Sequence, residues 1–166
     1  MDTKDVTIDV NGFEYSFSVG TKFGQVSASE TLSETLRNRL RLTGSKEACS
    51  EGACGCCTVI INGNAVTSCM TLTVDCDGKN ITTIEGLANP KTGELDPLQQ
   101  AFLDRYAFQC GYCTPGIIMA SKALLDKNPA PTDTEIKEAL SGNFCRCISQ
   151  YHVLEAVADI AKGVKQ

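Results

Sequence analysis

Apolar residues alternate with polar ones along the first stretch of the chain. Every second residue is apolar in segments 6–10 and 13–19, and Asn11-Gly12 separates the two segments. A period of two on both sides of an Asn-Gly pair is typical of a β-hairpin. A second apolar stretch, 59–61, runs into another such pair, Asn62-Gly63, and predicts a second hairpin.

A helix is expected between the two hairpins. Leu32, Leu36 and Leu40 recur at helical spacing after Ser29, a residue suited to the start of a helix, and Gly44 is placed to end it. A last apolar segment, 81–84, closes this half of the chain. The order ββαββ predicts a small mixed sheet with one helix, which we place at residues 1–84.

The periodicity lengthens to about four residues in the second half. Asp96-Pro97 and Thr114-Pro115 each place a cap residue and then a proline ahead of an apolar stretch, as at the start of a helix. Thr132 and Glu135 have the spacing of a capping box, with Gly142 as the stop of that helix. A last helix carries its apolar residues on one face: Val153, Ala156, Val157, Ile160, Ala161 and Val164.

These four short helices predict a bundle at residues 85–166, and the fold class is therefore α+β. The 166 residues are 42% hydrophobic and 21% charged, which favours a folded protein over a disordered one. No apolar run approaches the length of a membrane span, and residues 1–5 lack the regions of a signal peptide. We therefore expect a cytoplasmic protein. A net charge of −5 argues against a nucleic-acid partner, because phosphate binding needs a basic surface.

Ten cysteines and a single histidine, His152, restrict the chemistry that is open to the chain. A disulfide framework belongs to exported domains, so metal binding is the better interpretation in a reducing compartment. One histidine is too few for zinc sites with two histidines and for the Rieske centre. Iron–sulfur clusters and zinc held by four cysteines remain.

The first cysteine group has a specific spacing. Cys49, Cys54 and Cys57 form C-x4-C-x2-C, Cys69 follows on the next expected strand, and this is the plant-type [2Fe-2S] arrangement. The small residues at 52, 53 and 55 let a loop close around a cluster and bring backbone amides to its sulfurs. Structural zinc favours repeated C-x2-C pairs and fits this loop poorly.

The second group, Cys110-x2-Cys113 and Cys145-x-Cys147, is ambiguous by spacing, because zinc ribbons have the same pattern. Both pairs precede expected helices, whose positive N-terminal ends would suit an anionic cluster. Cys56 and Cys76 are interpreted as small buried thiols, since Cys56 neighbours a ligand and should face away from it. His152 is interpreted as a packing or capping residue, and no nucleotide-binding or hydrolase motif occurs.

Three long motifs resemble a known family. Segments 46–59 (KEACSEGACGCCTV), 109–116 (QCGYCTPG) and 142–147 (GNFCRC) are similar, in this order, to the small iron–sulfur subunit of molybdenum hydroxylases, the xanthine dehydrogenase and aldehyde oxidase family. The resemblance implies a β-grasp ferredoxin-like domain and a four-helix bundle, each with one [2Fe-2S] cluster. It also implies that Gln109 contacts the pterin of a partner subunit.

The function implied by this resemblance is electron transfer without a substrate-converting site in the chain itself. Electrons would pass singly from a large molybdopterin subunit through both clusters to an FAD subunit or another acceptor, because hydroxylation releases two electrons and each cluster carries one. A free-standing two-cluster carrier, a redox or iron sensor and a zinc-stapled interaction module are the alternatives.

Several positions depart from the family pattern. Ala48 stands where the family usually has glycine, and Cys56 replaces a small residue without sulfur. Residues 148–150 replace a Thr-Gly-Tyr sequence before the last helix, and residues 20–25 resemble an insertion after the first hairpin. None of these departures removes an expected ligand.

Overall fold

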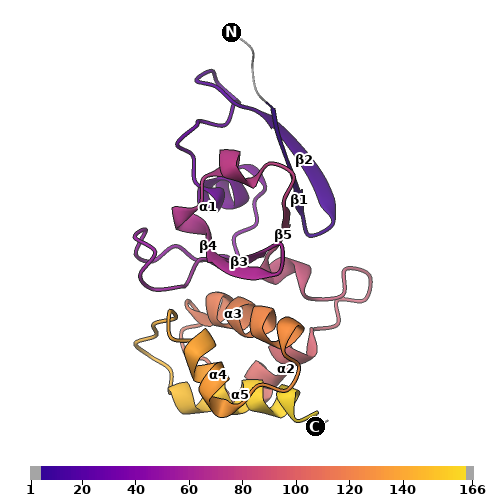
Figure 1. The fold of residues 1–166 in the computed structure, drawn as a ribbon, viewed down its shortest axis with the longest axis vertical. Helices are drawn as coiled ribbons and strands as arrows, with labels where there is room; N and C mark the ends of the chain where they lie inside the picture. Colours follow the sequence, from indigo (N-terminus) through magenta and orange to yellow (C-terminus); the bar gives the residue numbers. More distant parts are fainter. Residues whose placement is uncertain (1–4, 164–166) are drawn as a thin grey trace.

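The computed structural model describes residues 5–163, which form a sheet-containing half stacked on a helical half (Figure 1). Residues 1–4, part of the segment in which a signal peptide was sought, lie outside the described residues, as does Val164 of the last predicted helix. All strands come before residue 83 and the four longer helices come after residue 96.

The sheet has five strands in the order β2-β1-β5-β3-β4, with bounds β1 (Asp5–Val10), β2 (Phe13–Ser18), β3 (Thr58–Ile61), β4 (Asn64–Thr67) and β5 (Asn80–Thr82). Both predicted hairpins are confirmed. Each turns through an Asn-Gly pair with positive φ at both residues, a conformation whose twist matches that of the strands. β5 pairs parallel with β1 and antiparallel with β3, so the sheet is mixed as predicted.

The helix of the first half, α1 (Leu32–Glu34), continues into a π-helical turn, Thr35–Arg39. Its N-cap is Thr31, which exchanges hydrogen bonds with Glu34 in a capping box; Ser29 is not the cap. The helix ends at Leu40, because Arg41 adopts a φ of 60°, so Gly44 is not the stop. Its leucines do face the sheet, and Leu32 and Leu36 are fully buried against β1, β3 and β5.

The predicted bundle is confirmed as α2 (Pro97–Asp104), α3 (Thr114–Lys127), α4 (Asp133–Ala139) and α5 (Gln150–Ala161). Capping boxes begin α2 at Asp96 and α4 at Thr132; the box at Thr132 and the cap residue at Asp96 were expected, whereas the part that Gln99 plays at Asp96 was not. The start of α3 differs from the prediction, because Thr114 is already helical and Cys113 is the N-cap. α4 ends before Leu140, two residues short of Gly142.

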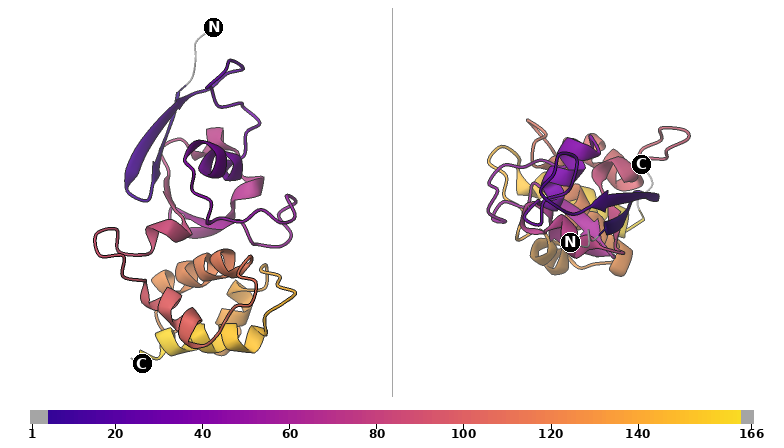
Figure 2. Two further views of the ribbon diagram at one scale, coloured as in Figure 1. Left: turned by 180° about the vertical axis from the view of Figure 1, so that it is seen from behind. Right: turned by 90° about the horizontal axis from the view of Figure 1, so that it is seen from above.

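The two halves meet where α3 crosses the face of the sheet at β3 (Figures 1 and 2). Ile60 of β3 packs there against Met119 and Ala123 of α3. At the N-terminal end of α3, Gly116 lies so close to the backbone of Gly55 and Cys56 that a Cβ would collide with their carbonyl oxygens. Glycine at this position therefore sets how closely the halves approach.

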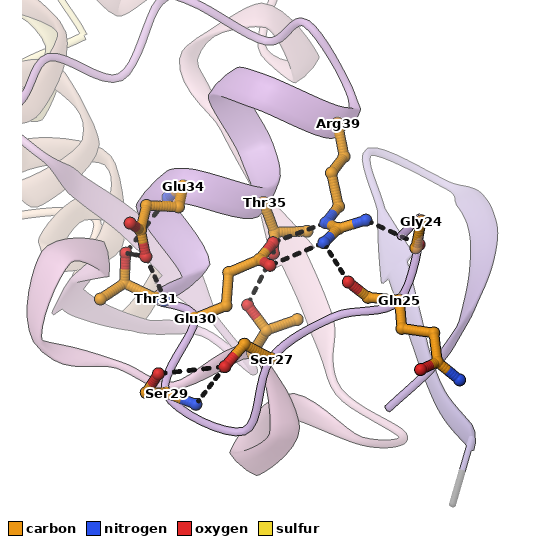
Figure 3. Close-up of polar contacts among 10 residues, drawn as sticks. Gly24, Gln25, Ser27, Ser29, Glu30, Thr31, Glu34, Thr35 and Arg39 are labelled. Carbon is orange, nitrogen blue, oxygen red and sulfur yellow. Dashed lines mark hydrogen bonds and ion pairs between the residues drawn. The ribbon is translucent and has the colours of Figure 1, made fainter. Parts of the chain in front are cut away.

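Residues 20–25, the segment that resembles an insertion, are tied to the helix of the first half by Arg39 (Figure 3). The guanidinium donates to the carbonyl oxygens of Gly24 and Gln25. It also forms a two-point ion pair with the Glu30 carboxylate, with N···O distances of 2.6 and 2.7 Å. Both side chains are largely buried, and the charge and hydrogen bonds of Arg39 hold the pKa of Glu30 below its ordinary value.

We expect Glu30→Gln to lower the free energy of unfolding by about 1 kcal/mol at neutral pH, because it removes a charge-assisted contact. A carboxyl group with a lowered folded pKa stabilises the protein above its unfolded pKa of 4.5, and this stabilisation is lost as pH falls through the folded pKa. The difference between variant and wild type should therefore shrink below pH 4.5. Urea unfolding at pH values above and below 4.5 measures the difference in free energy of unfolding, and Glu94→Gln, at an exposed residue, is the control. An equal difference at every pH would contradict the prediction.

We expect Gly116→Ala to lower the free energy of unfolding by about 1 to 3 kcal/mol, although alanine is the better helix former, because the new methyl group collides with backbone. Gly142→Ala is the matched control, since a Cβ there meets nothing within 4 Å. Urea unfolding followed by circular dichroism compares the two variants. Equal stability of the two would show that the approach at Gly116 is not a constraint.

Candidate metal centres

The first cysteine group lies on the loop before β3 and on the turn after β4. The hairpin register pairs Thr58 with Thr67, so its continuation places Cys57 opposite Ser68, and Cys69 is the next residue along the chain. The Ser68 hydroxyl donates to the Cys57 carbonyl oxygen at 2.8 Å and fixes this end of the hairpin. Cys57 and Cys69 are buried, whereas Cys49 and Cys54 are half-buried.

The loop of the first group is coiled so that backbone amides point at sulfur. Ser50, Gly52 and Gly55 all have φ between 56° and 72°, and such left-handed residues turn successive N–H groups to the same side. The amide of Glu51 lies 3.5 Å from the Cys49 sulfur and, with Cys54 and Ala53, lowers the pKa of Cys49 to about 7. A loop of this kind stabilises anionic sulfur.

The thiols of the first group lie close enough to influence one another. After the Glu51 amide, Cys54 contributes to lowering the pKa of Cys49. Burial, followed by the contact with Cys57, raises the pKa of Cys69 to about 11. Cys69 also lies within electrostatic range of Cys49, so the four thiols are neighbours.

The second group lies at the end of the bundle, between the loop before α3 and the loop before α5. Cys110 and Cys147 are paired, with 3.8 Å between their sulfurs, and Cys113 and Cys145 lie within electrostatic range of each other. Burial raises the pKa of Cys113 to about 12. Burial acts in the same direction on Cys145, but Cys113 and the amides of residues 147 and 148 lower its pKa overall.

The cysteines of this second group differ in how deeply they are buried. Cys113 is buried at the start of α3 and Cys145 is half-buried, whereas Cys110 and Cys147 are exposed. Gln109 is exposed beside Cys110. One end of this site therefore opens directly onto the protein surface.

Both groups suit a binuclear iron centre, because each iron of a [2Fe-2S] cluster takes two thiolates and each group offers four neighbouring thiols. Within residues 5–163, no set of three or more His, Cys, Asp or Glu side chains surrounds a single ion-sized point. Among the described residues, the Thr114 hydroxyl oxygen, next to Cys113, is the buried side-chain polar atom without a hydrogen-bond partner. A cluster at Cys113 would supply acceptors there, so the residues fit the group.

The two groups are joined by backbone contacts that the sequence did not reveal. The amide of Phe144 donates to the Cys54 carbonyl oxygen at 2.9 Å, and the Asn143 side chain donates to the Gly55 carbonyl oxygen at 3.0 Å. Phe144 directly precedes Cys145, so this hydrogen bond connects a cysteine of the first group to the residue next to a cysteine of the second. The motif GNFCRC contained both residues, but its spacing gave no indication of what they contact.

The remaining cysteines are buried thiols, as predicted. Cys76 is fully buried in the core of the first half, 3.5 Å from the Leu72 carbonyl oxygen. Cys56 is 5% exposed, and burial raises its pKa to about 12. His152, by contrast, is neither packed in the core nor a cap. It is exposed on α5, 3.9 Å from Glu155, and Ser149 occupies the N-cap position.

Comparison with known proteins places these features in a family. A model described as "2Fe-2S iron-sulfur cluster binding domain" matches residues 14–102, and one described as "[2Fe-2S] binding domain" matches residues 83–158. The nicotine 6-hydroxylase small subunit of Paenarthrobacter nicotinovorans is 44% identical over 158 residues, which cover 95% of this chain and 90% of the relative. The chain belongs to the small iron–sulfur subunits of molybdenum hydroxylases. The nicotinate dehydrogenase small FeS subunit of Eubacterium barkeri is 52% identical over 78% of this iron–sulfur subunit and 81% of the relative.

Solved structures share the fold of this iron–sulfur subunit. A chain of quinoline 2-oxidoreductase from Pseudomonas putida 86 matches with a TM-score of 0.85 and 36% identity over 96% of this chain and 93% of that chain. Aldehyde oxidoreductase from Desulfovibrio gigas matches with a TM-score of 0.85 and 39% identity, over 98% of this chain but only 18% of that longer chain. In the part of the subunit that the structure describes, no helix is both long and apolar enough to cross a membrane.

Proposed function

We propose that this chain is the electron-transfer subunit of a molybdopterin-dependent hydroxylase or dehydrogenase complex. Its ligands are Cys49, Cys54, Cys57 and Cys69 for a first [2Fe-2S] cluster, and Cys110, Cys113, Cys145 and Cys147 for a second. The observation that carries this proposal is that the eight thiols gather as two groups of four neighbours, with the sulfurs of Cys110 and Cys147 3.8 Å apart. Segments 1–84 and 85–166 are then two domains with one cluster each.

Each [2Fe-2S] cluster, when bound, takes up and gives back one electron, and the protein sets how favourable that is. The amides that point at Cys49 and Cys145 stabilise added negative charge on sulfur. Burial of Cys57, Cys69 and Cys113 acts in the opposite direction, because it removes water from the charged site. The chain also fixes the spacing of the sites through the Phe144–Cys54 hydrogen bond.

The graded burial of the second site supports the position of the partner subunits. Cys110, Cys147 and Gln109 are exposed, so a cofactor held by a large molybdopterin subunit can approach this end of the bundle. Tyr106 and Tyr151, from the segments on either side of this site, are 78% and 65% exposed, as expected of side chains that a partner covers. An FAD subunit or another acceptor then receives electrons from the first cluster, and the substrate is bound by the partner.

The proposal is tested most directly by the iron and acid-labile sulfide content of the purified complex and by its visible absorption. We expect about four irons and four sulfides per chain, as two [2Fe-2S] clusters require. Colourless protein that contains zinc would overturn the proposal in favour of a stapled interaction module. A coloured chain that purifies alone as a stable monomer would favour a free-standing carrier.

We expect Cys110→Ser to remove the second cluster, spare the first, and abolish electron transfer within the complex. The reason is that Cys110 and Cys147 form one thiol pair, and each iron of a [2Fe-2S] cluster is bound by two cysteine thiolates. Iron should fall to about half, and single-turnover reduction of the acceptor should stop. Cys76→Ser is the matched control, because Cys76 lies in the other core. Normal turnover of the Cys110 variant would refute the ligand assignment.

We expect Gln109→Ala to slow reduction of the second cluster without loss of iron. Its exposed amide lies beside Cys110 and, by this proposal, contacts the partner's pterin. Stopped-flow reduction by substrate, with iron counted in the same sample, measures the effect. An unchanged rate would count against the contact. Gln100→Ala on α2, whose side chain hydrogen-bonds Asp104, serves as the control glutamine.

A further inference from the structure

Tyr112 connects the two thiol groups through its side chain. It lies between Cys110 and Cys113 of the second group, and its hydroxyl donates a hydrogen bond to the Glu47 carbonyl oxygen at 2.8 Å. Glu47 precedes Cys49 of the first group by two residues. This hydrogen bond therefore joins the loop before α3 to the segment that leads into the first site.

The Tyr112 contact is separate from the contacts of the loop before α5. Phe144 and Asn143 of that loop donate to the carbonyl oxygens of Cys54 and Gly55, within the first cysteine motif. Tyr112 instead reaches the segment ahead of that motif. Each of the two loops that carry the second thiol group thus has its own hydrogen bond to the first half. Attachment at two points restricts rotation of one site against the other as well as their separation.

The acceptor of the Tyr112 hydrogen bond is held in place within the first half. Ser33 is fully buried on α1, and its hydroxyl donates to one oxygen of the Glu47 carboxylate at 3.1 Å. The Ser50 hydroxyl donates to the other carboxylate oxygen at 2.8 Å, and Ser50 directly follows Cys49. Because both carboxylate oxygens are bound, the backbone of Glu47 is fixed relative to Cys49.

The donor lies in the outer part of its loop. Cys113 is buried as the N-cap of α3, and the first turn of this helix is pressed against the first half at Gly116. Cys110 is exposed, and Tyr112 between the two cysteines is 45% exposed. The inner end of the loop is therefore fixed by packing, and the Tyr112 hydroxyl gives its outer end a direct contact with the first half.

We propose that Tyr112 is a positioning residue for electron transfer between the two clusters: its hydrogen bond to Glu47 holds the outer cysteine loop of the second site at a fixed separation from the first site. The inference rests on the ligand assignment made under the proposed function. In this step one electron leaves the reduced second cluster and enters the oxidised first cluster. The rate of such a transfer falls steeply with the separation of the two centres, so a site that moves away transfers more slowly on average.

The test uses the intact complex with wild type, Tyr112→Phe and the control Tyr15→Phe. Tyr112→Phe keeps the ring and removes only the hydroxyl donor. Tyr15→Phe removes the same group from β2, at the opposite edge of the sheet from β4. A flash-generated one-electron donor reduces the complex, and absorption follows the relaxation between the clusters. We expect Tyr112→Phe to slow this relaxation by up to about fivefold, because loss of an average hydrogen bond changes a conformational equilibrium by about that factor.

Glu47→Ala tests the same contact from the other half of the chain. It keeps the carbonyl acceptor but removes the carboxylate that Ser33 and Ser50 hold. We expect it to slow the relaxation as well. Combined with Tyr112→Phe it should add little further slowing, because both changes act on one hydrogen bond.

A second measurement does not depend on turnover or on the rate. When both clusters are reduced, electron paramagnetic resonance detects the magnetic coupling between them, which falls with the cube of their separation. We expect weaker and more widely distributed coupling in Tyr112→Phe than in wild type or Tyr15→Phe. Reduction potentials and the iron and sulfide content should remain at wild-type values.

Wild-type relaxation and coupling in Tyr112→Phe would overturn the inference, and so would equal slowing in Tyr15→Phe. A shifted potential of either cluster would attribute the slower rate to driving force instead of separation, and loss of iron would assign the hydroxyl to retention of the cluster; either result would overturn a positioning role. Effects of Tyr112→Phe and Glu47→Ala that multiply in the double variant would contradict a shared contact. Wild-type complex without [2Fe-2S] signals, in contrast, would overturn the proposed function itself.

Discussion

The contact between the cysteine loop of the first half and the start of α3 is the constraint on which the rest of the arrangement depends. Three consecutive carbonyl oxygens, those of Cys54, Gly55 and Cys56, face the bundle. The first accepts a hydrogen bond from the Phe144 amide and the second from the Asn143 side chain, and the third lies close to Gly116. Carbonyl groups removed from water need donors, and two of these three obtain them from the loop before α5. The two thiol groups are therefore held in register by one main-chain hydrogen bond, one side-chain hydrogen bond from Asn143 and the close approach at Gly116.

The two sites solve the same coordination problem with different scaffolds. In the first, a hairpin brings one pair together and a left-handed loop supplies the other. In the second, two loops at one end of the bundle each contribute one member to each pair. The consequence is a difference in exposure. The first site is enclosed at Cys57 and Cys69, whereas the second has an inner pair and a surface pair.

Local sequence patterns predicted most of the fold, and the errors have physical causes. The Asn-Gly turns and the capping boxes at Asp96 and Thr132 are local, so they could be predicted without knowledge of the tertiary structure. The capping box of Thr31 and Glu34 is equally local, and the prediction of a start at Ser29 was wrong. The positive φ of Arg41 could not be predicted from the local sequence, because a non-glycine residue rarely adopts this conformation.

For the candidate sites, spacing identified the cysteines but could not show how they associate. The partner of each thiol depends on strand register for Cys57 and Cys69, and on the packing of distant loops for Cys110 and Cys147. The location of Cys56 between both groups was likewise not predictable, since the alternation argument placed it only on the far side of its neighbour.

The strand order has a consequence for how the protein is made. β5 is the last strand in the chain, yet it lies at the centre of the sheet, between β1 and β3. On the ribosome, each hairpin can form from nearby residues as it emerges, but the two have nothing to join them until residues 80–82 are available. The complete sheet therefore exists only after the whole first half of the chain has been synthesised, although every cysteine of the first site has emerged before β5.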